Sequence, residues 1–309
     1  MISQRLTVDS RIHALRDALG GRARTDEPLA PHTTFRVGGP ADVFVEARTI
    51  DDLVNFVRLA RQHGVSFFIL GNGSNLLVRD GGIRGLVIEN HCDQHSLDAT
   101  TAIFTAESGA SLPGIANRLA RQGWSGLEWA IGVPGTLGGA VVGNAGAHGG
   151  SIADNLVAVT ILDADGATRR LPKTDCAFAY RTSRFKRDAR EVVLSAEFAL
   201  RRDDPPACIA RMNAYTEHRR RTQPTEPSVG SMFKNPPGDY AGRLIEQAGL
   251  KGTRVGNVEV SRVHANFFVN RGGATAQDAL RLVEIAQRAV REKFGIALEL
   301  EIQVVGAER

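Results

Sequence analysis

The chain has 309 residues, with 42% hydrophobic and 23% charged residues and a net charge of +4 at neutral pH. These values are typical of a folded globular protein and allow two or three domains. The positive charge is too small and too dispersed to indicate a nucleic-acid-binding protein, but it is compatible with a polyanionic small molecule such as a nucleotide.

Hydrophobic periodicity predicts helices and strands along the whole chain. Helices are predicted at 10–19, from Thr49 to Gly64, after Ser111, at 207–221, at 239–248 and from Thr275 onward. Strands are predicted at 41–47, 66–70, 76–78, 85–89, 101–107, 156–163, 168–171, 192–200, 265–270 and 297–305. The Asp-Asp-Pro-Pro stretch at 203–206 is the best candidate for a linker. Because the elements interleave without a strict βαβ rhythm, we expect an α+β fold.

We expect a cytoplasmic protein without membrane insertion. Residues 1–20 carry charges throughout and lack the apolar centre of a signal peptide. No apolar run approaches the roughly 20 residues that a membrane helix needs. Cys92, Cys176 and Cys208 are scattered and form no Cys-x-x-Cys or Cys/His cluster, so we expect neither a disulfide framework nor a metal site.

Two glycine-rich loops are candidates for ligand binding. The first, residues 71–75 (GNGSN), follows a predicted strand and can turn backbone N–H groups toward an anion, although a plain turn is the alternative. It matches neither a P-loop nor a dinucleotide fingerprint. The second, residues 132–140 (GVPGTLGGA) continuing to 143–147 (GNAGA), predicts close packing of backbone against a flat ligand. A flexible linker is its alternative, but the interspersed apolar residues favour packed structure.

The segment 230–236 (GSMFKNP) places one hydroxyl, Ser231, beside a cation, Lys234, and an amide, Asn235. Such a turn on a rigid scaffold is typical of a functional site. An ordinary surface turn also uses Gly, Ser, Asn and Pro for backbone reasons. Taken alone, the segment leaves both interpretations open.

Several motifs, taken in order, match one protein family. The matching segments are 33–40 (TTFRVGGP), 71–77 (GNGSNLL), 132–139 (GVPGTLGG), 144–147 (NAGA), 180–186 (YRTSRFK), 230–236 (GSMFKNP) and 298–302 (LELEI). In these motifs the chain resembles the UDP-N-acetylenolpyruvoylglucosamine reductases of bacterial cell-wall synthesis. The resemblance covers about residues 30 to 306, and the joint order of the motifs is far more specific than any one of them.

The resemblance implies an FAD-binding region of the vanillyl-alcohol-oxidase type in two lobes, followed by a C-terminal α+β substrate-binding domain. The first lobe is then 1–67, joined by the C-terminal strand 301–309, the second lobe is 68–204, and the substrate-binding domain is 205–300. FAD is implied as the bound cofactor and NADPH as the co-substrate. The implied FAD-binding residues are Gly71, Asn72, Gly73, Ser74, Asn75, Gly132, Pro134, Gly135, Thr136, Gly138, Asn144 and Ala145.

In the family, NADPH reduces the flavin, and flavin N5 passes hydride to UDP-N-acetylglucosamine enolpyruvate, which yields UDP-N-acetylmuramate. Arg181 and Glu301 match the arginine and glutamate that stabilise the enolate-like charge. Ser231 matches the proton donor. Periodicity alone does not separate Glu301 from Glu299, which shares its predicted strand face. Substrate contacts are implied for Lys234, Asn235 and His264.

The chain departs from the family pattern at a few positions. It looks like the subtype without the tyrosine-bearing insertion after the Tyr-Arg motif, so the contact to the UDP diphosphate stays open between Lys234, Asn235 and the arginines at 219–221. Asn72, His148 and Leu300 replace a common glycine, aromatic residue and proline. None of these changes removes a catalytic role.

We consider three other functions. A related flavin oxidase would need no NADPH, and its reduced flavin would react fast with oxygen. A non-enzymatic binder of flavin or UDP-sugar would be favoured if Ser231, Arg181 or Glu301 were missing, and all three are present. A nucleic-acid-binding protein would need a concentrated basic face with interleaved aromatic residues, which the sequence lacks.

Overall fold

The computed structural model describes residues 8–188 and 190–308. Residues 1–7 lie outside the described residues, and they are part of the stretch considered above for a signal peptide. Residue 309, the last of the strand 301–309 that is predicted to join the first lobe, also lies outside them. The chain divides into two compact units. The first unit comprises 1–23, 45–71 and 88–219, and the second comprises 24–44, 72–87 and 220–309. Each unit therefore gathers segments that are far apart in the sequence.

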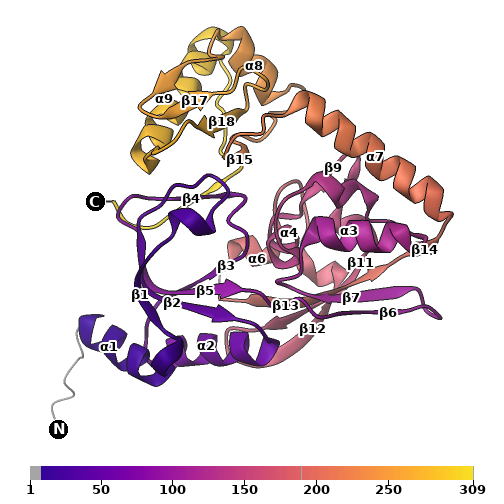
Figure 1. Cartoon of the computed structure of the whole chain (residues 1–309). Coiled ribbons are helices and arrows are strands. Elements are labelled where there is room, and N and C mark those ends of the chain that lie inside the picture. The colour runs from indigo at the N-terminus through magenta and orange to yellow at the C-terminus, as the bar shows by residue number, and fades with distance from the viewer. Residues whose placement is uncertain (1–7, 189, 309) are drawn as a thin grey trace. The chain divides into compact units, whose positions relative to one another are not determined.

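The first unit is built on a five-stranded antiparallel sheet in the order β12-β11-β13-β7-β6. Its strands are β6 (His95–Asp98), β7 (Ile103–Glu107), β11 (Leu156–Leu162), β12 (Thr168–Pro172) and β13 (Val192–Ala199). Helices α3 (Leu112–Arg121) and α4 (Leu137–Gly143) lie over one face of this sheet (Figure 1). The core between them contains Phe104, Leu137 and Phe198, all almost completely buried. Apolar burial of this kind is the main stabilising force of the unit.

Shorter elements complete the first unit. They are α1 (Val8–Leu19), η1 (Gly20–Arg22), α2 (Ile50–Gln62), β3 (Phe67–Leu70), β8 (Trp124–Ser125), η3 (Glu128–Gly132), β9 (Gly146–Ala147), β10 (Gly150–Ser151), α5 (Ile152–Asn155), η4 (Lys173–Cys176), α6 (Arg184–Arg187) and β14 (Arg201–Arg202). Helix α2 forms as its sequence predicts, because the Thr49 side chain accepts a hydrogen bond from the Asp52 N–H and caps the first turn. Its apolar face, which includes Leu53 and Phe56, is buried.

The second unit contains a four-stranded antiparallel sheet in the order β15-β18-β17-β16. The strands are β15 (Ser228–Ser231), β16 (Arg254–Val255), β17 (Val258–Val260) and β18 (Phe267–Asn270). Helices α8 (Ala241–Gln247) and α9 (Ala276–Phe294) pack with this sheet around a core that includes Phe233 and Phe268 (Figure 1). Both carboxylate oxygens of Asp80 accept backbone N–H groups at the start of α9, which holds this helix to the segment 72–87.

The remaining strands belong to two further sheets. One sheet has the strand order β1-β2-β5-β3 and includes β1 (Arg24–Pro28), β2 (Pro40–Ala47) and β5 (Ile83–Asn90). The short helix η2 (Ala30–His32) lies between β1 and β2 in the chain. Strand β19 (Gln303–Val305) runs parallel to β4 (Leu76–Val78). No described helix is both long and apolar enough to cross a membrane.

The structure corrects two sequence-based predictions. Residues 203–206 are not a linker, because α7 (Pro205–Thr222) begins at Pro205, and proline is well suited to the first turn of a helix. The predicted strand at 297–305 is reduced to Gln303–Val305 in the described chain. Upstream of it, the alternation does place Leu298 and Ile302 in the core of the second unit. Among the described residues, however, this segment pairs only through an isolated bridge between Leu300 and Phe233. The α+β class is confirmed, while the expected division at 67, 204 and 300 stays a prediction.

Candidate active site

Arg181 lines a hollow of about 320 Å³ in the first unit. Residues 144, 146–151 and Tyr180 form the rest of its wall. The Arg181 backbone has a φ of 56°, which is uncommon for a residue with a side chain, and Ala179 and Thr182 exchange backbone hydrogen bonds around it. The Arg181 guanidinium donates a 3.1 Å hydrogen bond to the Gly146 carbonyl. A tight turn therefore presents a cation to the glycine-rich segment.

Asn144 holds this region together. It ends α4 with a φ of 44°, in the left-handed region that asparagine tolerates. Its side chain donates a 3.0 Å hydrogen bond to the Ala179 carbonyl and accepts one of 3.1 Å from the Ala153 N–H. The side chain implied to contact FAD is thus also a bridge between α4, α5 and the turn that carries Arg181.

The two glycine-rich loops meet within the first unit at Gly71 and Thr136. A Cβ added to Gly71 would lie 2.5 Å from the Thr136 Oγ1, so only glycine permits this approach. Along α4, a Cβ on Gly139 would lie 3.6 Å from the Thr136 Oγ1, and one on Gly143 would meet nothing within 4 Å. At Gly139 and Gly143, α4 thus offers backbone without side chains and with room beside it. This surface fits a flat cofactor such as FAD.

Other residues implied to bind FAD have contacts within the protein. Gly132 makes room for the buried stem of Arg219, whose pKa is lowered by desolvation. The Gly138 N–H donates to the Ser108 carbonyl, and the Gly135 carbonyl accepts from Leu112. Pro134 is exposed, Ala145 is half-buried, and Asn72 and Ser74 lie in the second unit beside a buried Gly73. These contacts shape the loops and are compatible with a ligand on their open side.

Ser231 and Glu301 lie on neighbouring segments of the second unit. The Glu301 N–H donates a 2.9 Å hydrogen bond to the Met232 carbonyl, and Phe233 forms a bridge with Leu300. The side chain of Asn75 donates to the Glu301 carbonyl at 3.3 Å. Three segments that are far apart in the sequence therefore converge at this point.

Asn266 positions the Ser231 segment, and the sequence analysis missed it. This buried side chain accepts a 2.9 Å hydrogen bond from the Phe233 N–H and donates one of 2.8 Å to the Phe233 carbonyl. The Asn266 carbonyl also accepts from the Met232 N–H at 2.7 Å. A lone asparagine carries no sequence signal for such a role, since the partners are 33 residues away.

The structure distinguishes the two glutamates that periodicity leaves equivalent. Glu299 is exposed and forms a 3.0 Å ion pair with Lys234 Nζ. Glu301 is half-buried and follows the bridge to Phe233. The two carboxylates therefore have different surroundings, and Lys234, an implied substrate contact, is engaged by Glu299.

Asn235 and His264 also have protein partners. Asn235 Oδ1 accepts a 3.1 Å hydrogen bond from the Ala241 N–H at the start of α8. His264 Nδ1 accepts from the Asn266 N–H at 3.2 Å, and the imidazole lies edge-on to the Phe267 ring. These bonds fix both side chains, and their contact with substrate stays a prediction.

We expect acid to destabilise the protein through two histidines. Desolvation lowers the pKa of His148, with a further contribution from Arg219, and desolvation also lowers that of His264. Since the unfolded chain then binds protons more readily, stability is fully present above the ordinary histidine pKa of about 6.5 and is lost as the pH falls below it. Urea unfolding between about pH 8 and 5.5 should show this decline.

Two substitutions test this pH dependence. His148→Phe keeps a ring against Tyr215, with which His148 stacks at 4.3 Å, and His264→Asn keeps an acceptor for the Asn266 N–H. Each variant should lose less stability on acidification than the parent protein, and the double variant least. His13→Gln, on an exposed site of α1, is the control. Equal pH profiles in all variants would remove both histidines from the explanation.

The predicted catalytic residues are divided between the units. Arg181 belongs to the first unit, and Ser231 and Glu301 belong to the second. Their catalytic roles stay predictions. Arg181 lines a hollow with residues of the second glycine-rich loop, and the Glu301 carbonyl accepts from Asn75 of the first.

Comparison with known proteins identifies the family. A family model described as the C-terminal domain of UDP-N-acetylenolpyruvoylglucosamine reductase matches residues 223–305, and an FAD-binding domain model matches residues 41–172. A UDP-N-acetylenolpyruvoylglucosamine reductase from Chloroflexus aggregans is 44% identical over 94% of this chain and 100% of its own length. The chain belongs to the UDP-N-acetylenolpyruvoylglucosamine reductase family.

Other members of the reductase family agree with this assignment. The reductase of Rubrobacter xylanophilus is 47% identical over 92% of this chain and 95% of its own length. The crystal structure of the Thermus caldophilus reductase is 37% identical and superimposes with a TM-score of 0.78, covering 91% of this chain and 97% of that one. The expected FAD-containing reductase of peptidoglycan precursor synthesis is therefore confirmed.

Proposed function

We propose that the protein reduces UDP-N-acetylglucosamine enolpyruvate to UDP-N-acetylmuramate in the cytoplasm, with NADPH as the source of reducing equivalents. The glycine-rich segments 71–75 and 132–147 would hold FAD, which would supply the hydride chemistry between the nicotinamide and the enolpyruvyl group. The observation that carries the assignment of roles is the backbone pairing of the Met232 and Glu301 segments, next to Ser231. It supports a proton donor and a carboxyl group acting on one substrate.

Each catalytic residue has a distinct role in this proposal. The Arg181 guanidinium stabilises the negative charge that develops beside the substrate carboxylate, because a fixed cation costs no reorganisation at the moment of reaction. Glu301, which matches the family's glutamate, acts with Arg181 on the same developing charge. Ser231 Oγ gives its proton to the carbon next to the carboxylate. A hydroxyl is a weak acid, but the carbanion is a strong base, so this transfer runs downhill.

An anaerobic absorbance experiment tests this function. The purified yellow protein should bleach on addition of NADPH, and the oxidised flavin spectrum should return on addition of UDP-N-acetylglucosamine enolpyruvate. NADH in place of NADPH measures the nicotinamide preference. A flavin that bleaches but returns only with oxygen would instead support a flavin oxidase. A colourless protein that FAD does not reconstitute would contradict the proposed cofactor.

A further inference from the structure

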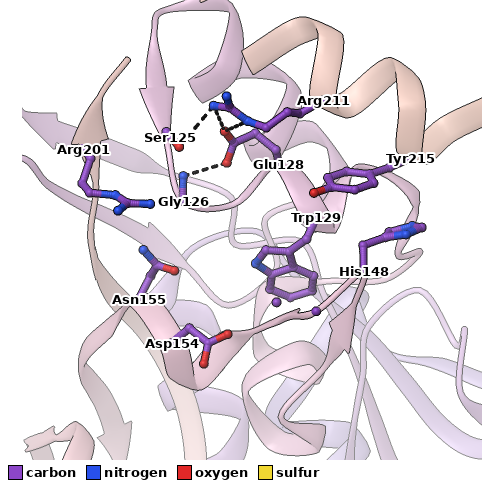
Figure 2. Close-up of a pocket in the computed structure, with 12 residues that line it drawn as sticks. Ser125, Gly126, Glu128, Trp129, His148, Asp154, Asn155, Arg201, Arg211 and Tyr215 are labelled. Carbon is purple, nitrogen blue, oxygen red and sulfur yellow. Dashed lines mark hydrogen bonds and ion pairs between the residues drawn. The ribbon is translucent and has the colours of Figure 1, made fainter. Parts of the chain in front are cut away.

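A second hollow, of about 250 Å³, lies in the first unit (Figure 2). Its walls come from β8, η3, the hairpin of β9 and β10, α5, β14 and α7. It shares only residues 148–150 with the hollow that Arg181 lines. None of the residues assigned to the reaction borders it, so the proposed function leaves this hollow without a role.

Trp129 turns an unsatisfied hydrogen-bond donor toward this hollow. Its side chain is among the buried residues, with 6% of its surface exposed. Every other buried side-chain nitrogen or oxygen of the described residues has a hydrogen-bond partner, but Trp129 Nε1 has none. Figure 2 shows this ring nitrogen on the side of the indole that faces Asn155. Because a buried donor is costly to leave unpaired, the position favours an external acceptor.

Glycines keep the hollow open beside the indole. A Cβ on Gly150 would lie 2.5 Å from Trp129 Cδ1, so any side chain here would push the indole out of position. Gly149 has a φ of 81°, which favours glycine, and a Cβ there would meet nothing within 4 Å. At these two glycines the hairpin thus lines the wall around Trp129 with backbone and not with side chains.

One wall of the hollow is held by an ion-pair network. Arg211 donates to Glu128 Oε1 at 2.6 Å and also to Asp203, while Glu128 Oε2 accepts from the Gly126 N–H at 2.7 Å. Both side chains of the Arg211–Glu128 pair are therefore satisfied by the protein. They form a fixed wall of the hollow, and a ligand would have to form its hydrogen bonds with other groups.

Arg201 is the cation that a ligand can engage. It is exposed on β14, and Figure 2 shows its guanidinium pointing into the hollow above Asn155. No residue that the structure describes forms a hydrogen bond or ion pair with this guanidinium. The acceptors of the hollow are Asp154, which already accepts from the Ser151 N–H at 2.7 Å, and the amide oxygen of Asn155. The hollow thus combines two donors, Trp129 Nε1 and the Arg201 guanidinium, with the carboxylate of Asp154.

We propose that this hollow is a binding site for a small oxyanion that also carries a hydroxyl or amino group. The carboxylate or phosphate oxygens of the ligand accept from Trp129 Nε1 and from Arg201. Its hydroxyl or amino group donates to Asp154, which would repel an anion that has no such donor. The ligand contacts residues 148–150, which also line the hollow of Arg181.

Calorimetric titration of the FAD-loaded protein tests the site without measuring turnover. The probes are glycerol 3-phosphate, D-glycerate and L-serine, with inorganic phosphate as the anion that lacks a hydroxyl or amino group on a carbon chain. At least one of the first three should bind with a dissociation constant of about 1 mM or lower, and more tightly than inorganic phosphate. The probe that binds most tightly shows whether the site prefers a phosphate or a carboxylate.

Matched variants locate the binding. Arg201→Ala and Trp129→Phe should each weaken it at least about tenfold, because each removes one donor. Arg202→Ala is the control, since Arg202 stacks on Trp124 at 3.9 Å and donates to the Gln122 carbonyl instead. Arg201 is exposed, so its variant remains informative even if Trp129→Phe fails to fold.

Three results would overturn the proposal. The first is the absence of binding heat for every probe up to about 20 mM, because a dissociation constant above that concentration would not indicate a specific site. The second is equal affinity in the parent protein and the Arg201→Ala variant. The third is displacement of the probe by UDP-N-acetylglucosamine enolpyruvate in competition, which would make the hollow part of the substrate site.

Discussion

Ser231→Ala should lower turnover by about 10²- to 10⁴-fold, the usual contribution of a positioned general acid, or about 3 to 5 kcal/mol. Flavin reduction by NADPH should proceed at the parental rate, because the proton is needed only after hydride reaches the substrate. Rapid mixing under anaerobic conditions separates the two half-reactions. The fold should persist, since Ser231 is half-buried at the end of β15 and the core residue Phe233 is untouched.

Two further variants make the Ser231 test specific. Ser231→Thr keeps a hydroxyl and should retain much more turnover than Ser231→Ala. Ser228→Ala, at the other end of the same strand, removes a hydroxyl without a proposed role and should react as the parent does. Near-parental turnover in Ser231→Ala would show that the proton comes from another group.

Arg181→Ala should slow reoxidation of the reduced flavin by the enolpyruvyl sugar by about 10²- to 10³-fold, as expected when one preorganised group that stabilises transition-state charge is lost. Arg181→Lys should recover only part of the rate, because a lysine ammonium cannot reproduce the planar guanidinium that donates to the Gly146 carbonyl. The measurement is the rate of return of flavin absorbance in the second half-reaction.

The control for Arg181 is another arginine of the same segment. Arg190 is exposed and ion-paired with Asp188, so Arg190→Ala should leave both half-reactions unchanged. If Arg181→Ala reoxidises as fast as the parent protein, Arg181 has no part in the charge stabilisation. If NADPH fails to reduce the flavin in Arg181→Ala, the defect lies in cofactor geometry instead.

Elements with strong local signals could be predicted from the sequence. Helix α9 begins where expected because the Thr275 side chain accepts a hydrogen bond from the Asp278 N–H, which satisfies a group at the helix start. Helix α2 follows the same rule at Thr49. By contrast, prolines at 205 and 206 are compatible with both a linker and a first helical turn, and only the structure decided between them.

The site shows a similar division. Arg181, Ser231 and Glu301 could be named from their motifs, because each motif keeps its residues within a few positions of one another. Periodicity could not do this, and it left Glu299 and Glu301 equivalent until the ion pair of Glu299 with Lys234 distinguished them.

The sequence by itself determined the family, the α+β class, the capped helices and the candidate catalytic residues, since these depend on short-range patterns or on ordered motifs. Only the tertiary structure placed Asn266 against Phe233, Glu301 beside Met232, and the Trp129 Nε1 at an open hollow. These relations join residues that are far apart in the chain or depend on what surrounds a side chain. Their free energy comes from the packing of whole elements, which no local pattern encodes.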